Sequence, residues 1–191
     1  MEEQIYYHKL VKLMQMAYSG ELAAAYAYQG HWRAVRREDE REAIRQIEQD
    51  EWHHRHQIKE ILQQLEAQPN PFYEVKYFLI GRLIGVLCHI IGWYLAMYGA
   101  GRLERKNVLE YAYAADYANQ CGRPEFVECF LEMSETEWEH EKFFRDKVES
   151  HFLRHILPVW EQLPPKEDFR LQCRELVSSP SILVGIASPQ L

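Results

Sequence analysis

Glu-Trp-His-His at residues 51–54 and the related Glu-Trp-Glu-His at residues 137–140 decide the fold of this 191-residue chain. Each stretch contains a Glu and a His three residues apart, in a segment whose apolar residues recur with the period of an α-helix. Two residues at this spacing lie on the same face of a helix, one turn from each other. Each pair can therefore give one carboxylate oxygen and one imidazole nitrogen to a single metal ion.

Four long helices are expected around these stretches. Their predicted spans are residues 2–34, 39–67, 73–119 and 124–152. The third would be about 70 Å long at 1.5 Å per residue, more than the other helices can cover, so we expect a break near Gly99-Ala100-Gly101. Its apolar stripe stays in phase through that point and is predicted to face the core: Leu83, Leu87, Ile90, Tyr94, Met97, Gly101, Glu104, Val108, Tyr111 and Ala115.

Two further glutamates interrupt the apolar stripes of the first and third helices. Glu21 precedes Glu51 by 51 − 21 = 30 residues, and Glu104 precedes Glu137 by 137 − 104 = 33 residues. The chain thus contains two helical hairpins of similar size, each supplying a Glu and then a Glu-x-x-His. A carboxylate on a buried stripe needs a metal ion, a proton or a charged partner. Glu110 lies off the stripe and is only the reserve for Glu104.

Four carboxylates and two imidazoles on four helices are the donor set of ferritin-like di-metal bundles. We therefore predict an all-α, antiparallel four-helix bundle over residues 1–152. The extension at residues 153–191 is expected to pack on the bundle or on a neighbouring subunit of a homodimer. The predicted metal ligands, which are also the catalytic residues, are Glu21, Glu51, His54, Glu104, Glu137 and His140. Such oxygen-rich ligands suit two iron ions, with manganese as the alternative, whereas structural zinc prefers Cys and His.

The composition argues against several classes of protein and of metal site. The net charge of −7 argues against a nucleic-acid surface, which normally needs a basic face. The four cysteines form no C-x-x-C pair, which argues against a zinc ribbon or a rubredoxin-type iron site. Without the basic and apolar regions of a signal peptide at its start, the chain is expected in the cytoplasm, or as a peripheral protein on the inner face of the membrane.

An apolar segment at residues 83–101 has the length of a membrane span, with His89 as its one side chain that carries charge near neutral pH. A helix buried in the bundle, or lying at a membrane surface, is the favoured interpretation, because Glu104 follows directly. We expect residues 78–101 to make any membrane contact.

Aromatic residues on the predicted inner faces are the remaining candidates for a role at the site. Tyr28, Tyr94, Tyr111 and Phe144 would limit the access of water or relay electrons. Packing in the core is the favoured interpretation of all four.

A family resemblance supports the di-metal prediction. The stretch from Tyr18 to Gly30, Tyr-Ser-Gly-Glu-Leu-Ala-Ala-Ala-Tyr-Ala-Tyr-Gln-Gly, is similar to the first helix of demethoxyubiquinone hydroxylases. That family continues with a Glu-x-x-His helix, a glycine-rich apolar segment, a Glu and a final Glu-x-x-His. The resemblance covers about residues 15–148. The chain departs from the family at Tyr18-Ser19, where His-Ala is common, at residues 103–106, where the family has a paired Glu, and in the extension after residue 152.

The resemblance implies a di-iron monooxygenase of ubiquinone biosynthesis. Its partners would be dioxygen, an electron donor and an apolar ring substrate such as a quinone precursor, and its apolar segment would face the membrane that holds this lipid. The alternative is a ferritin-like ferroxidase that handles iron without an organic substrate. A bundle that keeps the fold only as a structural module is disfavoured because all six ligands are present. Rubrerythrin-like peroxidases and ferritin-like tRNA hydroxylases are disfavoured by the cysteine spacing and the acidic charge.

Overall fold

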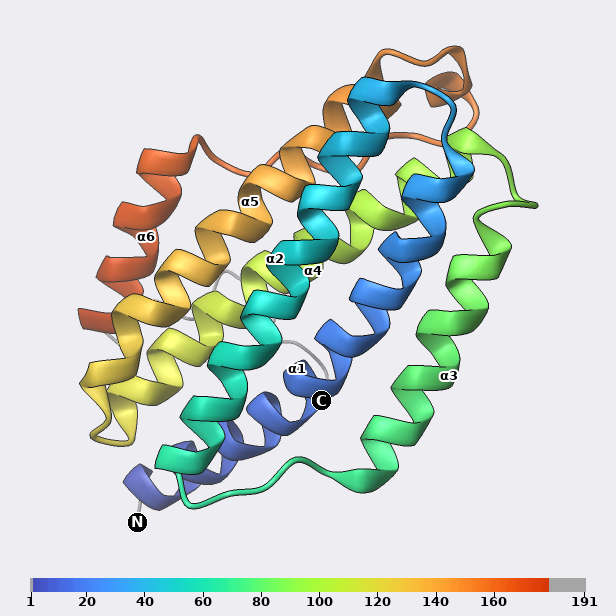
Figure 1. Cartoon of the computed structure of the whole chain (residues 1–191). Helices are drawn as coiled ribbons and strands as arrows, with labels where there is room; N and C mark the ends of the chain where they lie inside the picture. Colours follow the sequence, from blue (N-terminus) through green and yellow to red (C-terminus); the bar gives the residue numbers. More distant parts are fainter. Residues whose placement is uncertain (1, 179–191) are drawn as a thin grey trace.

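The computed structural model describes residues 2–178 and confirms the predicted ferritin-like helical bundle (Figure 1). Helices α1 and α2 form one hairpin, and α4 and α5 form the other. Helix α3 connects the hairpins and lies beside α1. The helices are α1 (Glu2–Ala34), α2 (Glu38–Gln64), α3 (Pro71–Leu87), α4 (Trp93–Gln120), the 3-10 turn η1 (Pro124–Phe126), α5 (Val127–Glu149), the 3-10 turn η2 (Phe152–His155) and α6 (Lys166–Ser178).

The core of the bundle consists of two apolar clusters separated along its length. One cluster contains Leu10, Ile58, Val108 and Phe130, and the other contains Tyr28, Ile47, Met97 and Phe144. On each of the four bundle helices the charged residues of the predicted stripes fall between the two clusters. The helical period therefore carries a polar layer into the middle of the core, where only mutual contacts or bound ions can offset the loss of hydration.

The predicted break in the third long helix is at the wrong place. Helix α4 is continuous through Gly99 and Gly101, and the chain breaks instead between Cys88 and Gly92. Gly92 has a φ of 84°, in the region that glycine adopts without steric cost, and it stands directly before α4. Gly101 serves packing instead, because the ring of Trp160 occupies the space where a Cβ would lie.

The predicted inward face of residues 83–90 is also wrong. Leu83 and Ile90 are 60% and 73% exposed, whereas Gly81 and Gly85 are buried. Small residues let α3 approach the backbone of α1 closely, and the large aliphatic side chains of Leu79, Leu83 and Val86 are exposed. Within residues 2–178, no helix is both long and apolar enough to cross a membrane.

The segment after α5 returns along the second hairpin, and α6 packs against α4 and α5 (Figure 1). Bundle side chains donate hydrogen bonds to its backbone carbonyls: Tyr94 to Leu157, Arg145 to Trp160, and Trp138 to Pro164. Residues 182–191, which the sequence predicts to pack on the bundle or on a neighbouring subunit, lie outside the described residues.

Candidate metal centre

All six predicted ligands converge in the polar layer. Glu21 comes from α1, Glu104 from α4, and the two Glu-x-x-His pairs from α2 and α5. None of the six is more than 5% exposed: they are Glu21, Glu51, His54, Glu104, Glu137 and His140. Their assignment as ligands stays a prediction, but the fold brings every one of them to the same place.

The donor atoms form two overlapping groups. Glu21, Glu51, His54 and Glu137 bring ligand atoms within 4.8 Å of one another, and so do Glu51, Glu104, Glu137 and His140. Glu51 and Glu137 belong to both groups. Because a carboxylate has two oxygens, these two residues could each contribute to both of two neighbouring ions, and the other four would then contribute to one ion each.

Seven of the ligands' buried polar atoms lack a hydrogen-bond partner within the described part of the chain. They include both carboxylate oxygens of Glu51 and of Glu137, Oε2 of Glu21, and Nδ1 of His54 and of His140. The orphaned atoms face one another: His54 Nδ1 lies 2.9 Å from Glu137 Oε1, and His140 Nδ1 lies 3.6 Å from Glu51 Oε1. Buried polar atoms without partners are rare and costly. Their convergence fits bound cations, and the carboxylate-rich set fits iron or manganese.

Four residues beyond the six hold the donors in place. The hydroxyl of Tyr28 donates to Glu104, and that of Tyr111 donates to Glu21. Asn107 Nδ2 donates to Glu104 Oε2 over 3.1 Å, and His140 Nε2 lies 3.2 Å from Asp50 Oδ2. A carboxylate on the outer nitrogen of a metal-bound imidazole fixes the ring and its tautomer. From the sequence the two tyrosines are expected to pack in the core. Asp50 and Asn107 are not predicted from the sequence because they lie off the apolar stripes.

Burial and crowding of charge shift the pKa values of the cluster in opposite directions. Burial, together with the nearby charge of Glu137, raises the pKa of Glu51 and of Glu104 well above the ordinary value. Burial also opposes ionisation of Glu137, but contacts with His140 and His54 outweigh it and lower the pKa of Glu137. Burial would likewise lower the pKa of His140, yet Asp50 and Glu137 raise it to about 9. Crowded carboxylates away from solvent are stabilised by nearby positive charge, which protons, imidazolium groups or bound cations can each provide.

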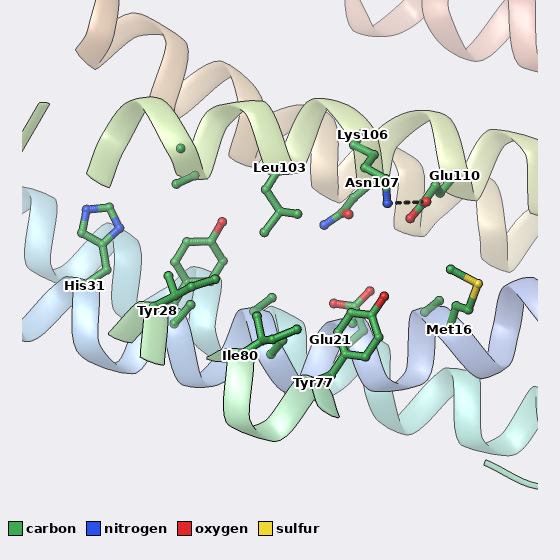
Figure 2. A pocket seen from close by; sticks show the side chains of 18 of the residues that line it. Met16, Glu21, Tyr28, His31, Tyr77, Ile80, Leu103, Lys106, Asn107 and Glu110 are labelled. Carbon is green, nitrogen blue, oxygen red and sulfur yellow. Dashed lines mark ion pairs between the residues drawn. The ribbon is translucent and has the colours of Figure 1, made fainter. Parts of the chain in front are cut away.

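Next to the polar layer is a cavity of about 370 Å³, walled by α1, α3 and α4 (Figure 2). Its lining extends along α1 from Leu13 to His31, a separation of 31 − 13 = 18 residues or roughly 27 Å of helix. Ile80, Ile84 and Leu103 contribute an apolar wall. Such a long, largely apolar space beside a set of charged ligands is typical of a site for a hydrophobic small molecule.

Glu21 and Tyr111 line this cavity as well as contacting the ligand cluster. The cavity and the candidate metal centre are therefore contiguous. Glu110, the reserve ligand, is in the cavity wall and not in the cluster: it is 17% exposed by its side chain and pairs with Lys106 over 2.6 Å (Figure 2).

Comparison with known proteins adds one match. The protein-family model described as "Ubiquinone biosynthesis protein COQ7" matches residues 8–108, which is more than half of the chain. Neither the comparison with curated proteins nor the comparison with solved structures gives a match. The matched region contains Glu21, Glu51, His54 and Glu104, and it ends before the second Glu-x-x-His pair.

Proposed function

Because the chain belongs to the ubiquinone biosynthesis protein COQ7 family, we propose that it is a di-iron monooxygenase that hydroxylates an apolar ring such as a quinone precursor. One observation carries the proposal: the buried donor atoms without partners lie beside an apolar cavity, and Glu21 and Tyr111 belong to both. A ring held in this cavity would lie next to the ions that the cluster is suited to bind.

The proposed ligands and the residues that contact them have different roles. Glu51 and Glu137 would be shared between two ions, with Glu21 and His54 completing one set of ligands and Glu104 and His140 the other. Two iron ions, when bound, supply the activation of dioxygen that ring hydroxylation needs. Tyr28, Asn107 and Tyr111 orient the carboxylates by donating hydrogen bonds to them. The apolar cavity wall keeps water away from the reacting ring.

The overall reaction replaces a ring hydrogen by a hydroxyl group. One atom of dioxygen enters the product, and the other leaves as water. The balance requires two electrons and two protons, so an external two-electron donor is part of the proposal. The chain would then use three partners: dioxygen, an apolar ring substrate and a reductant.

We also propose that the substrate enters the cavity from a membrane surface. The outer face of α3 and the turn after it present large apolar side chains to solvent, among them Val75, Leu79, Leu83, Val86 and Ile90. Apolar patches of this extent mark sites of interaction. The cavity wall includes Ile80, Ile84 and Leu103, each more than a third exposed, so the apolar outer face is continuous with the cavity. A lipid-soluble substrate would enter along this face.

The test is incorporation of labelled oxygen. The iron-loaded protein, a reductant, ¹⁸O₂ and a benzoquinone with one unsubstituted ring position should give a product with one labelled oxygen. Glu104→Gln, which alters a proposed ligand, should give none, whereas His53→Ala, at an exposed position of α2, should keep the activity. Hundreds of ferric ions per assembly without a labelled product would instead support the ferroxidase alternative. The homodimer expected from the sequence stays a prediction. Light scattering tests it by measuring the mass of the protein in solution.

A further inference from the structure

One polar side chain of the cavity has no part in the candidate metal centre. His31 of α1 lines the cavity, is 2% exposed, and has no hydrogen-bond partner for its Nε2 among the described residues. A buried ring nitrogen that makes no hydrogen bond destabilises a protein, so its presence calls for a reason. In Figure 2 the imidazole is at one end of the cavity, beside Tyr28.

Packing fixes the orientation of this imidazole. Its ring is nearly parallel to the rings of Tyr28 and Phe144, with interplanar angles of 21° and 12° and centroid distances of 6.4 Å and 5.9 Å. Tyr28 in turn donates its hydroxyl hydrogen to Glu104. The imidazole is therefore held in a defined position relative to the proposed ligands.

The neighbouring polar groups are already engaged. Tyr28 and Asn107 both donate to Glu104, and Lys106 pairs with Glu110. Burial lowers the pKa of His31 to about 4, so its imidazole is neutral at physiological pH. A neutral imidazole donates from one nitrogen and accepts at the other, and it adds no charge to an apolar space.

We propose that His31 positions the substrate through a hydrogen bond between Nε2 and an oxygen substituent of the ring that occupies the cavity. This inference rests on the proposed function and specifies its substrate class: a ring that bears a carbonyl or hydroxyl oxygen, attached to apolar groups that fill the aliphatic part of the cavity. The substrate oxygen then supplies the partner that none of residues 2–178 gives to Nε2 of His31.

The alternative is a core histidine without a function. That alternative predicts similar effects of a substitution on every ligand, whereas a hydrogen bond to substrate predicts effects only on ligands with an oxygen. Two probes of similar size separate these outcomes: a dimethoxy-methyl-benzoquinone and the oxygen-free ring tetramethylbenzene. Binding of each to the purified full-length chain is measured by calorimetry, and the metal content of every sample is recorded.

The expected result is selective. His31→Phe keeps a ring that can stack on Tyr28 and Phe144, and it should weaken quinone binding about tenfold, the effect of losing one hydrogen bond. Its affinity for tetramethylbenzene should stay the same or increase. His31→Gln, which retains a hydrogen-bonding group, should recover most of the quinone affinity. The solvent-exposed His53→Phe is the matched control and should change neither affinity.

Other results overturn the inference in distinguishable ways. Equal losses for both probes in His31→Phe, or failure of both His31 variants to fold, would make His31 a structural residue and leave the proposed function standing. Unchanged quinone binding in His31→Phe would do the same. A wild-type chain that binds neither probe would reject the cavity as a ring site, and the proposed function would fail together with the inference.

Discussion

Gly85 of α3 lies directly on the backbone of α1, so that a Cβ on Gly85 would be only 2.7 Å from the carbonyl oxygen of Tyr26. At Gly81 the corresponding distance, to the carbonyl oxygen of Ala23, would be 2.5 Å. The two glycines are four residues apart, on one face of α3. Their lack of a side chain sets the separation of α3 from α1, and with it the shape of the cavity between them.

The first prediction follows from this contact. Gly85→Val should destabilise the protein by roughly 1–3 kcal/mol, because backbone atoms of α1 cannot yield to the added methyl groups without moving α3. Denaturant unfolding measures the loss, and hydrogen exchange should locate it in α3. Gly20→Ala is the control: its Cβ would have no neighbour within 4 Å, and alanine favours a helix interior. Equal stability of the two variants would contradict the close packing.

The second prediction concerns metal content. Protein produced with iron should contain about two iron ions per chain. His54→Ala should lose most of the metal because it removes a proposed donor, whereas the adjacent and exposed His53→Ala should lose none. Elemental analysis gives both numbers. Full metal retention in His54→Ala would remove the basis for the assigned centre.

The third prediction separates Glu104 from Glu110. Glu104 is fully buried in the cluster, and Glu110 pairs with Lys106 in the cavity wall. Glu104→Gln should therefore reduce metal content, since an amide is a weaker and uncharged ligand, and Glu110→Gln should leave it unchanged. The comparison requires elemental analysis of the two variants and the wild type. The reverse outcome would mean that α4 is rotated relative to this structure.

The fourth prediction concerns the apolar face of α3. Leu79 and Leu83 are each 60% exposed, and burying such a side chain in lipid is favourable by roughly 1.5–3 kcal/mol. Leu79→Asp with Leu83→Asp should lower the affinity for phosphatidylcholine vesicles by at least about tenfold. Vesicle flotation measures the bound fraction. Leu171→Asp, at an equally exposed position of α6, should have no effect.

The fifth prediction is a pH dependence of stability caused by His31. Burial lowers the pKa of its imidazole from an ordinary value of 6.5 to about 4 in the folded protein, so the unfolded chain takes up the proton first. The contribution of the neutral His31 to the free energy of unfolding is therefore complete above pH 6.5 and is lost as the pH falls toward 4. The loss amounts to about 2 kcal/mol at pH 5.

His31→Phe does not have this proton-linked loss. Its free energy of unfolding, minus that of the wild type, should increase between pH 7.5 and pH 5. Subtracting one protein from the other cancels the contribution of the carboxylates that both contain. Denaturant unfolding at the two pH values gives the difference, and a difference independent of pH would contradict a neutral, buried His31.

The helical period accounts for most of what the sequence predicted about the site. Glu21 recurs in step with Met14 and Tyr28, and Glu51 and His54 recur in step with Ile47 and Ile58. Within each helix these residues are near neighbours in the chain, so the local geometry of the helix suffices to put them on one face. The convergence of four such faces follows once they share a bundle.

Residues outside this pattern were missed because no local signal marks them. Asp50 lies beside a predicted ligand but off the stripe, and its role depends on His140, which is 140 − 50 = 90 residues away. His31 does follow Tyr28 at a helical step of three, so the stripe was a signal that could have found it. The lack of a hydrogen-bond partner for its Nε2 among the described residues, however, follows only from the packing around the cavity.

By itself, the sequence determined the all-α bundle and the meeting of the Glu-x-x-His pairs with Glu21 and Glu104. A helix repeats every 3.6 residues, and this repeat can be recognised from residues that are close together in the chain. Only the tertiary structure decided where the third long helix breaks and which way α3 faces. Those features depend on contacts between backbones far apart in the chain, such as Gly85 on Tyr26, and on the positive φ of Gly92. A stripe of apolar residues indicates that one face is apolar, and the close packing of small residues decides which neighbour, if any, covers it.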